Sequence, residues 1–435
     1  MKNEKWKIIL LFPLILHAKS FDQLIKLIDN SNLVKIYQKN IQIQKEKFNQ
    51  AKAKNYGKVD LEYDYSHFFE NPTVNFDLVS PVAAENAGTA PLYPLIYKEF
   101  DTKMKMGDKN NFIGSLVYSY PLFTGFAITE VINIQKLNVI KSKLELDNIK
   151  RNLILKTAKL YAGIYALNKK IEALKEAEIS LLSAKAKAEA LFKEGLINKS
   201  TLDEIDAKCY EINANISKTI AEKKSLLNIL SYILNTKINS VSNIPIEKLK
   251  NENILNRPDV KMLETALKIT QNYIKLVKSN FLPKIYFQAG IKKEATNIGL
   301  DKNNYQNVDK SFVALSFQYN LFKGGEDTSK LQEAKLAKLK TFIYFRDYLN
   351  KVKTTYKNDL LMLKALKKRL FAAKKEIEAR KSYYEYIKAK FEQGLADVTD
   401  LNSAIAKLAQ SKAKKDYIKS QIFFWTLKTN IDGGD

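Results

Sequence analysis

The chain contains two copies of one sequence unit, and this duplication limits the available folds more than any other feature. The segment LVYSYPLFTG begins at position 116 and aligns with LSFQYNLFKG at position 315, an offset of 315 − 116 = 199. The phrase FKEGLINKSTLD at 192–203 aligns with FEQGLADVTDLN at 391–402 at the same offset. The distance between the two landmarks is therefore equal in both copies. We predict two similar units that fill nearly the whole chain.

Upstream of these landmarks the offset changes. GKVDLEY begins at position 57 and aligns with PKIYFQA at position 283, an offset of 283 − 57 = 226. The extra 226 − 199 = 27 residues must lie between 70 and 111, so the first copy is expected to have a longer loop there. We predict a first repeat at 21–235, a linker at 236–257, a second repeat at 258–429 and a tail at 430–435.

Four segments alternate between apolar and polar residues, which predicts β-strands. Two of them are VDLEYDYS and IYFQAGIK, and the other two precede Gly125 and Gly324. Strands of roughly ten residues with one apolar face fit the wall of a transmembrane barrel with a wet lumen. A soluble, half-buried sheet would alternate in the same way and remains open here. Four strands cannot enclose an aqueous channel, so a membrane barrel would need several chains.

The remaining length predicts long helices. The segment from about 128 to 192 contains no proline and one internal glycine, and 328–391 contains neither residue. Leucine recurs every seven residues in the first segment, at Leu146, Leu153, Leu160, Leu167, Leu174 and Leu181. Such a heptad pattern is typical of a coiled coil, and 65 helical residues would extend roughly 100 Å. Shorter helices are expected at 33–55, 200–235, 258–281 and 399–429.

Composition argues against catalysis and against nucleic-acid binding. The formal net charge is +25, but it comes mostly from lysines spread along the helices with glutamates between them. This pattern favours solvated helix faces over a nucleic-acid site. Cys209 is the only cysteine and lies among isoleucines at helical spacing, so we interpret it as a small core residue. With two histidines in the chain, we expect no enzyme activity, no cofactor and no metal site.

The N-terminal sequence MKNEKWKIILLFPLILHAKS has the organisation of a secretory signal peptide. A basic start precedes an apolar centre, and Ala18-Lys19-Ser20 provides small residues for the exit. We predict a signal peptide at 1–20 with cleavage near Phe21. The apolar centre is shorter than a helical membrane span, so we expect an exported chain without a helical anchor.

These features together resemble the TolC-like outer-membrane efflux ducts, or outer membrane factors. The resemblance rests on the signal peptide, the duplicated strands and coils, YPLFTG and YNLFKG, the EGL and QGL reversals, and NRPDV at the second copy. It covers essentially residues 21–429. It implies an α/β membrane protein in which three chains share a twelve-stranded barrel, with four strands per chain, continued by a long helical coiled-coil barrel in the periplasm.

The resemblance also implies a function. Such a homotrimer docks on a periplasmic adaptor, or membrane fusion protein, and on an inner-membrane efflux or ABC-type pump. It passes substrates outward through the outer membrane, in an efflux pump or in type I secretion. Two alternatives remain: a secreted coiled-coil scaffold, and a periplasmic adaptor protein. The cargo stays open among drugs, metals and secreted proteins.

The two reversals are the candidate functional site. The resemblance implies that Gly195, Leu196, Gly394 and Leu395 form tips that contact the adaptor. Glycine permits the positive φ that ends a helix, and the leucine offers an apolar knob. We expect Ser200 with Asp203, and Thr399 with Asn402, to cap the return helices.

Acidic residues near the reversals are candidates for the closed periplasmic aperture. Asp400 matches the position where the family often has an acidic ring, and Asp397 lies one turn earlier. Asp203, at the end of the first reversal, is the third candidate. Three copies of one carboxylate around an axis would favour cations. An acidic residue that meets the dipole of a helix N-terminus is the competing interpretation.

Overall fold

The computed structural model describes residues 18–83, 95–302 and 310–434, and the chain divides into two units. A helical unit comprises the described parts of Met1–Gln44, Leu137–Lys268 and Leu339–Asp435. A strand unit comprises the described parts of Lys45–Lys136 and Ile269–Lys338. The predicted signal peptide lies largely outside the described residues, since these begin at Ala18.

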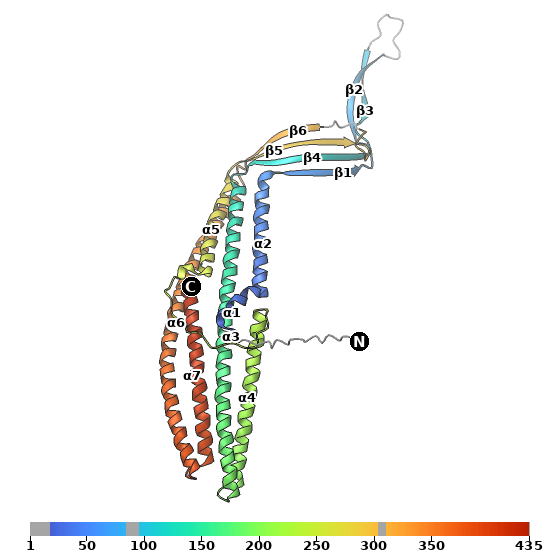
Figure 1. Ribbon diagram of the computed structural model, residues 1–435. Helices are drawn as coiled ribbons and strands as arrows, with labels where there is room; N and C mark the ends of the chain where they lie inside the picture. Colours follow the sequence, from blue (N-terminus) through green and yellow to red (C-terminus); the bar gives the residue numbers. More distant parts are fainter. Residues whose placement is uncertain (1–17, 84–94, 303–309, 435) are drawn as a thin grey trace, which may run out of the picture. The chain divides into compact units, whose positions relative to one another are not determined.

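The helices have the lengths that the duplication predicts. The long helices α3 (Ala127–Lys193) and α6 (Glu326–Glu392) each have 67 residues, roughly 100 Å of helix. The return helices α4 (Lys199–Ile233) and α7 (Val398–Asp432) each have 35 residues. The incoming helices are α2 (Asn32–Ala53) and α5 (Pro258–Lys278), and α5 begins at a proline, which is favoured in the first turn. Figure 1 shows the α3–α4 and α6–α7 hairpins.

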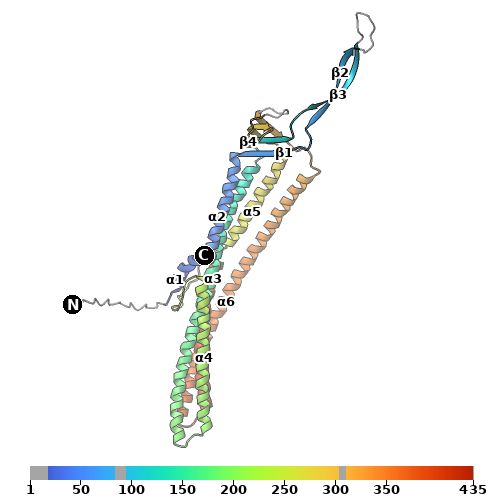
Figure 2. The ribbon, with the colours of Figure 1, turned by 90° about the vertical axis from the view of Figure 1, so that its right-hand side faces the viewer.

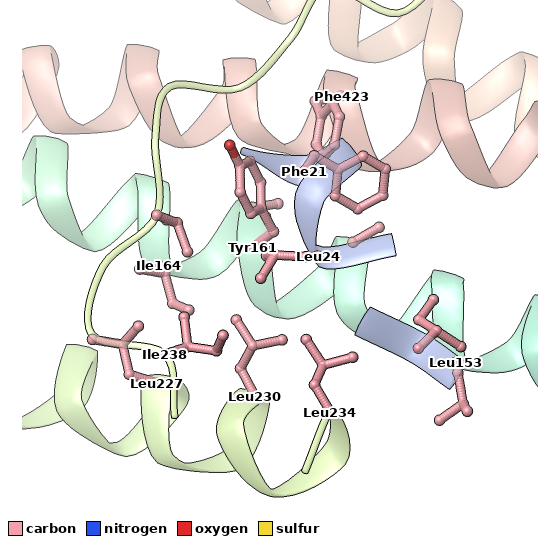
Figure 3. Packing of buried hydrophobic residues seen from close by; sticks show 14 of the residues in the cluster. Phe21, Leu24, Leu153, Tyr161, Ile164, Leu227, Leu230, Leu234, Ile238 and Phe423 are labelled. Carbon is pink, nitrogen blue, oxygen red and sulfur yellow. The ribbon is translucent and has the colours of Figure 1, made fainter. Parts of the chain in front are cut away.

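The helical unit has a core at the level of the N-terminal helix α1 (Phe21–Lys26). Phe21 and Leu24 insert between α3, α4 and α7 and contact buried side chains from all three helices (Figure 3). The heptad leucines of α3 other than Leu167 contribute to this core or to a second cluster nearer the reversals, and Leu153 and Leu181 are 4% and 5% exposed. The predicted coiled-coil stripe is therefore confirmed as a packed face.

A buried ionic network holds the start of the second repeat in the helical unit. Arg257, in the NRPDV motif, pairs with Asp259 at 2.7 Å and with Asp432 of α7 at 3.0 Å. Arg151 of α3 pairs with both carboxylates. Lys428 of α7 joins Asp432 at 2.8 Å. Buried charges of opposite sign at this spacing compensate for each other's desolvation.

The strand unit contains a four-stranded antiparallel sheet in the order β1-β4-β5-β6. Its strands are β1 (Lys58–His67), β4 (Asn110–Phe123), β5 (Lys284–Ala295) and β6 (Lys310–Gln318). The register confirms the predicted alternation, since it aligns apolar residues across the sheet in rows such as Leu61–Leu116–Ile291. A bulge interrupts the alternation at Leu122, because Pro121 pairs with Tyr286 and Phe123 with Ile285. Both β1 and β6 are edge strands of this sheet.

Two features of the strand unit differ from the sequence expectation. The segment at 71–110, expected to be a loop, contains a separate two-stranded sheet of β2 (Thr73–Ala83) and β3 (Leu95–Lys105). Its tip at 84–94, which includes the start of PLYPLIY, lies outside the described residues. β6 ends at Gln318, although the repeated motif continues to Gly324, because its pairing with β5 stops where Lys284 begins that strand.

Candidate functional site

Each reversal of the helical unit is built by the same hydrogen-bonded turn. Gly195 and Gly394 have φ of +73°, a left-handed conformation that favours glycine. The Leu196 N–H donates to the Leu191 carbonyl at 2.9 Å, and the Leu395 N–H donates to the Lys390 carbonyl at 2.8 Å. Each of these bonds spans five residues and closes a turn that ends α3 or α6. The bonds satisfy carbonyl groups that a helix end leaves free. Both reversals lie at the same end of the helical unit (Figure 2).

The leucines that follow the glycines are exposed in both copies. Leu196 is 67% exposed and Leu395 is 68% exposed. The phenylalanines before the glycines differ, since Phe192 is 39% exposed whereas Phe391 is 6% exposed. The second reversal thus inserts its aromatic ring into the apolar cluster of the helical unit, and the first does not. The sequence repeat did not predict this difference, because both copies have phenylalanine at this position.

The N-cap residues of the two return helices lie two positions before Ser200 and Thr399, the expected caps. Asn198 is the N-cap of α4, and its side-chain oxygen accepts from the Thr201 N–H at 2.9 Å. Asp397 occupies the N-cap position of α7. Ser200, Asp203, Thr399 and Asn402 therefore lie inside the helices, and their expected role as caps was wrong. The left-handed glycine reverses the chain within a few residues, so each return helix begins four residues after its glycine, at Lys199 and Val398.

The two return helices contact each other near their N-terminal ends. The Thr399 hydroxyl donates to the Glu204 carboxylate, with Oγ1–Oε1 and Oγ1–Oε2 distances of 3.2 and 3.4 Å. Farther along, Lys412 of α7 pairs with Glu176 of α3 at 2.5 Å. An apolar cluster fills the space between the hairpins, with contributions from Leu181, Ala188, Ile205, Ile212, Phe391, Val398, Leu401 and Ile405. Sequence reasoning missed Glu204, because no local pattern links it to Thr399.

The three predicted aperture carboxylates, Asp203, Asp397 and Asp400, are all exposed near the reversals. Asp397 lies near the Thr399 hydroxyl, with an oxygen–oxygen distance of 3.5 Å. Asp400 lies in the first turn of α7, and Asp203 lies just after the first turn of α4. Within the described part of the chain, the structure assigns neither of these two an ion pair. The structure thus brings Asp397 to the contact between the hairpins and leaves the other two in solvent.

A groove of about 590 Å³ lies beside this contact, between α3, α4 and α7. Its floor is apolar and includes Leu174, Leu181, Ile212 and Ile405. Along α4 the lining includes Glu204, Lys208, Glu211, Ile212 and Asn215, and along α7 it includes Thr399, Asn402, Ser403, Ile405, Ala406, Ala409, Gln410 and Ala413. Most of these residues lie three or four positions apart, so the groove is lined by one face of α4 and one face of α7.

Cys209 is partly buried beside the same apolar cluster, as expected for a small core residue. Burial raises the pKa of its thiol, which disfavours the thiolate that a nucleophile needs. Among the described residues, no group of three or more His, Cys, Asp or Glu side chains is placed to hold a metal ion. None of the described helices has the length and apolarity that a membrane span requires.

Comparison with known proteins shows similarity to one family over part of the chain. The model of the outer membrane efflux protein family matches residues 249–421, which include the NRPDV motif, β5, β6 and the second reversal. The match covers 173 of the 435 residues, so the second repeat of this chain is similar to the outer membrane efflux protein family. No match to a curated protein is found.

Solved structures share the fold of this chain along nearly its whole length. The CmeC outer membrane channel of Campylobacter jejuni has 17% identity and a TM-score of 0.74, over 95% of this chain and 86% of that chain. VceC of Vibrio cholerae has 14% identity and a TM-score of 0.72, over 95% and 96% of the respective chains. MtrE of Neisseria gonorrhoeae, in its open state, has 17% identity and a TM-score of 0.71, over 94% and 89%. The fold is TolC-like in both repeats.

Proposed function

We propose that three copies of this chain form one channel that connects the periplasm with the cell exterior. The observation that carries the proposal is the four-stranded sheet, which has two edge strands and an exposed apolar face. Leu61 of β1 is 80% exposed, and Val313 and Leu315 of β6 are 74% and 70% exposed. Leucine and valine at such exposure favour contact with lipid over contact with water.

The strand order shows how several copies could join into one barrel. Free sheet edges invite pairing with another chain, and β6 of one copy can pair antiparallel with β1 of the next. Closing this ring with three copies yields an even number of about twelve strands, which is the arrangement of bacterial outer-membrane barrels. The polar face of the sheet, with Asp60, Glu62, Gln288 and Lys292, would then line a wet lumen.

The reversals of the helical unit would contact a periplasmic adaptor. Leu196 and Leu395 supply exposed apolar side chains, and the groove between α3, α4 and α7 has the residue spacing that accepts a helix. A helical hairpin of an adaptor fits this surface best, since helices pack into seams at heptad spacing. The adaptor would connect the channel to an inner-membrane pump, which supplies the energy. The family description supports an efflux pump in preference to a type I secretion system.

The acidic residues at the reversals would govern the aperture. In a trimer, Asp400 is repeated three times near the channel axis, and so are Asp397 and Asp203. Such rings attract cations and repel anions. The Thr399–Glu204 contact between the hairpins would hold the closed form, because the two hairpins must separate for the aperture to widen.

Disulfide crosslinking between copies tests the trimer directly. In a Cys209→Ser background, a cysteine at Leu61 of β1 is combined with one at Val313, Leu315 or Phe317 of β6. At least one pair is expected to join three chains into a covalent ring in isolated outer membranes. The control pair combines Leu61 with Phe287 of the inner strand β5, and it is expected not to crosslink. A soluble monomeric product in the periplasm would contradict the proposal and support an adaptor or scaffold.

A further inference from the structure

The folded helical unit uses the chain from Lys19 onward. The Lys19 main chain forms a parallel bridge with Val241 in the linker between the repeats. Its N–H donates to the Ser240 carbonyl at 3.1 Å, and its carbonyl accepts from the Ser242 N–H at 3.0 Å. Both bonds require Lys19 to be part of the mature protein. Ala18, immediately before it, is exposed.

Ser20 is equally integrated into the fold. Its hydroxyl oxygen accepts from the Gln23 N–H at 3.3 Å, and its own N–H donates to the Gln23 side chain at 3.0 Å. This reciprocal pair is a capping box, which satisfies two donors at the start of α1. A chain that began after Ser20 would lose both bonds and leave α1 without a cap.

Phe21 is a poor position for a chain terminus. Its side chain is 1% exposed and contacts the rings of Tyr161 and Phe423 at centroid distances of 5.5 and 5.2 Å (Figure 3). A terminal ammonium on this residue would lie at the positive end of a helix and beside an apolar cluster. Lys19 is half-buried, so an ammonium there can keep its bond to Ser240 and still contact water.

We propose that the signal peptide is removed between Ala18 and Lys19, so that Lys19 begins the mature protein. The cut hydrolyses the Ala18–Lys19 peptide bond with one water molecule, leaving a carboxylate on Ala18 and an ammonium on Lys19. Leader peptidases favour small residues at the first and third positions before the cut, and a cut after Ala18 fills the first with Ala18 and the third with Leu16. A cut after Ser20, next to Phe21, has small residues at both positions, but only the cut after Ala18 preserves the bridge and the capping box. The inference depends on export through the predicted signal peptide and not on the channel function.

N-terminal sequencing tests the proposal. The full-length chain is expressed with its own signal peptide in a Gram-negative host and purified from the membrane fraction. The expected sequence is Lys-Ser-Phe-Asp-Gln. A sequence that begins Phe-Asp-Gln-Leu would overturn the proposal, and so would an intact Met1. Neither result would affect the proposed channel function, which the crosslinking experiment tests separately.

The variant Ser20→Tyr distinguishes the two cutting sites without relying on the folded state. A large residue at position 20 blocks a cut after Ser20, whereas it lies beyond the bond between Ala18 and Lys19. The variant is expected to be processed to a chain beginning Lys-Tyr-Phe-Asp, in an amount within about two-fold of the wild type. Accumulation of the uncut precursor in this variant would show that the natural cut follows Ser20.

Discussion

The hydroxyl of Thr399 lies 3.2 Å from a carboxylate oxygen of Glu204, although 195 positions separate the two residues in the chain. This hydrogen bond joins the first turn of α7 to the second turn of α4, and therefore joins the two hairpins near their reversals. A hydrogen bond to a charged group contributes more than one between neutral groups, but exposure to water reduces the contribution to about 1 kcal/mol.

Removing this hydroxyl is expected to favour the open channel. Thr399→Val keeps the shape of the side chain but cannot donate to Glu204. Loss of about 1 kcal/mol shifts the ratio of open to closed channels about five-fold toward the open form. Single-channel conductance in planar bilayers measures this shift. The control is Thr354→Val, because Thr354 bonds only within its own helix. Equal conductance in both variants would rule out a gating role for the contact.

The left-handed turns predict a cost for any side chain with a Cβ at the reversals. Nothing lies within 4 Å of a Cβ built on Gly394, so the expected cost of Gly394→Ala is conformational only, at about 1–2 kcal/mol. Gly394→Asn should cost less, because asparagine tolerates this conformation. Thermal unfolding of the purified protein measures both variants. Equal stability of the alanine and asparagine variants would contradict the conformational explanation.

The exposed leucines predict the adaptor surface. The double variant Leu196→Ser and Leu395→Ser is expected to weaken adaptor binding by about ten-fold or more, because apolar anchors dominate such interfaces. Its thermal stability should remain close to that of the wild type, since both side chains are exposed. Leu361→Ser is a matched control, because Leu361 is also 67% exposed but lies on α6 away from the reversals. Co-purification with the cognate adaptor after crosslinking provides the measurement.

Asp400 predicts cation selectivity. Replacing Asp400 with asparagine removes three carboxylates from a trimer and should lower the ratio of cation to anion permeability by about five-fold. The reversal potential across a salt gradient reports this ratio. Glu378→Gln, on the exposed surface of α6, removes the same number of charges away from the reversals. If both variants shift the potential equally, net charge and not an aperture ring determines selectivity.

The buried ionic network predicts an unusual pH dependence. Asp359 is 3% exposed, and burial raises the pKa of its carboxyl to about 6, despite its contact with Lys428 at 2.5 Å. In the unfolded chain this group titrates near 3.8. The folded protein therefore binds more protons between these two values. The contribution of Asp359 to stability falls as pH rises from about 4 through 6, by on the order of 1–3 kcal/mol.

Asp259 and Asp432 change the stability with pH in the opposite direction to Asp359. Their arginine and lysine partners lower the pKa of both carboxyl groups, against the effect of burial. Their contribution is present above pH 4 and is lost below it. Asp359→Asn should therefore remove the fall in stability between pH 4 and 6. The loss of stability below pH 4, which comes from Asp259 and Asp432, should remain. Unfolding temperatures across this pH range, compared with those of Asp347→Asn on the same helix, measure the effect. An unchanged slope in Asp359→Asn would contradict the prediction.

The sequence by itself determined the duplicated architecture. Heptad leucines, the absence of proline and the alternating strand segments are local patterns, and each one specifies its element without information from the rest of the chain. The lengths of α3 and α6, the return helices and the apolar row through Leu61 and Leu116 all followed from such patterns. The two glycine reversals could also be predicted from local sequence, because each depends on the backbone conformation of one residue.

Only the tertiary structure decided which equivalent residues behave alike. Phe192 and Phe391 occupy the same position in the repeat, yet one is exposed and the other is buried, because the two hairpins pack against different neighbours. The Thr399–Glu204 contact and the insertion of Phe21 and Leu24 between three helices depend on distant parts of the chain meeting. Periodicity in a sequence defines a helix face, but burial and pairing depend on what the fold places against that face.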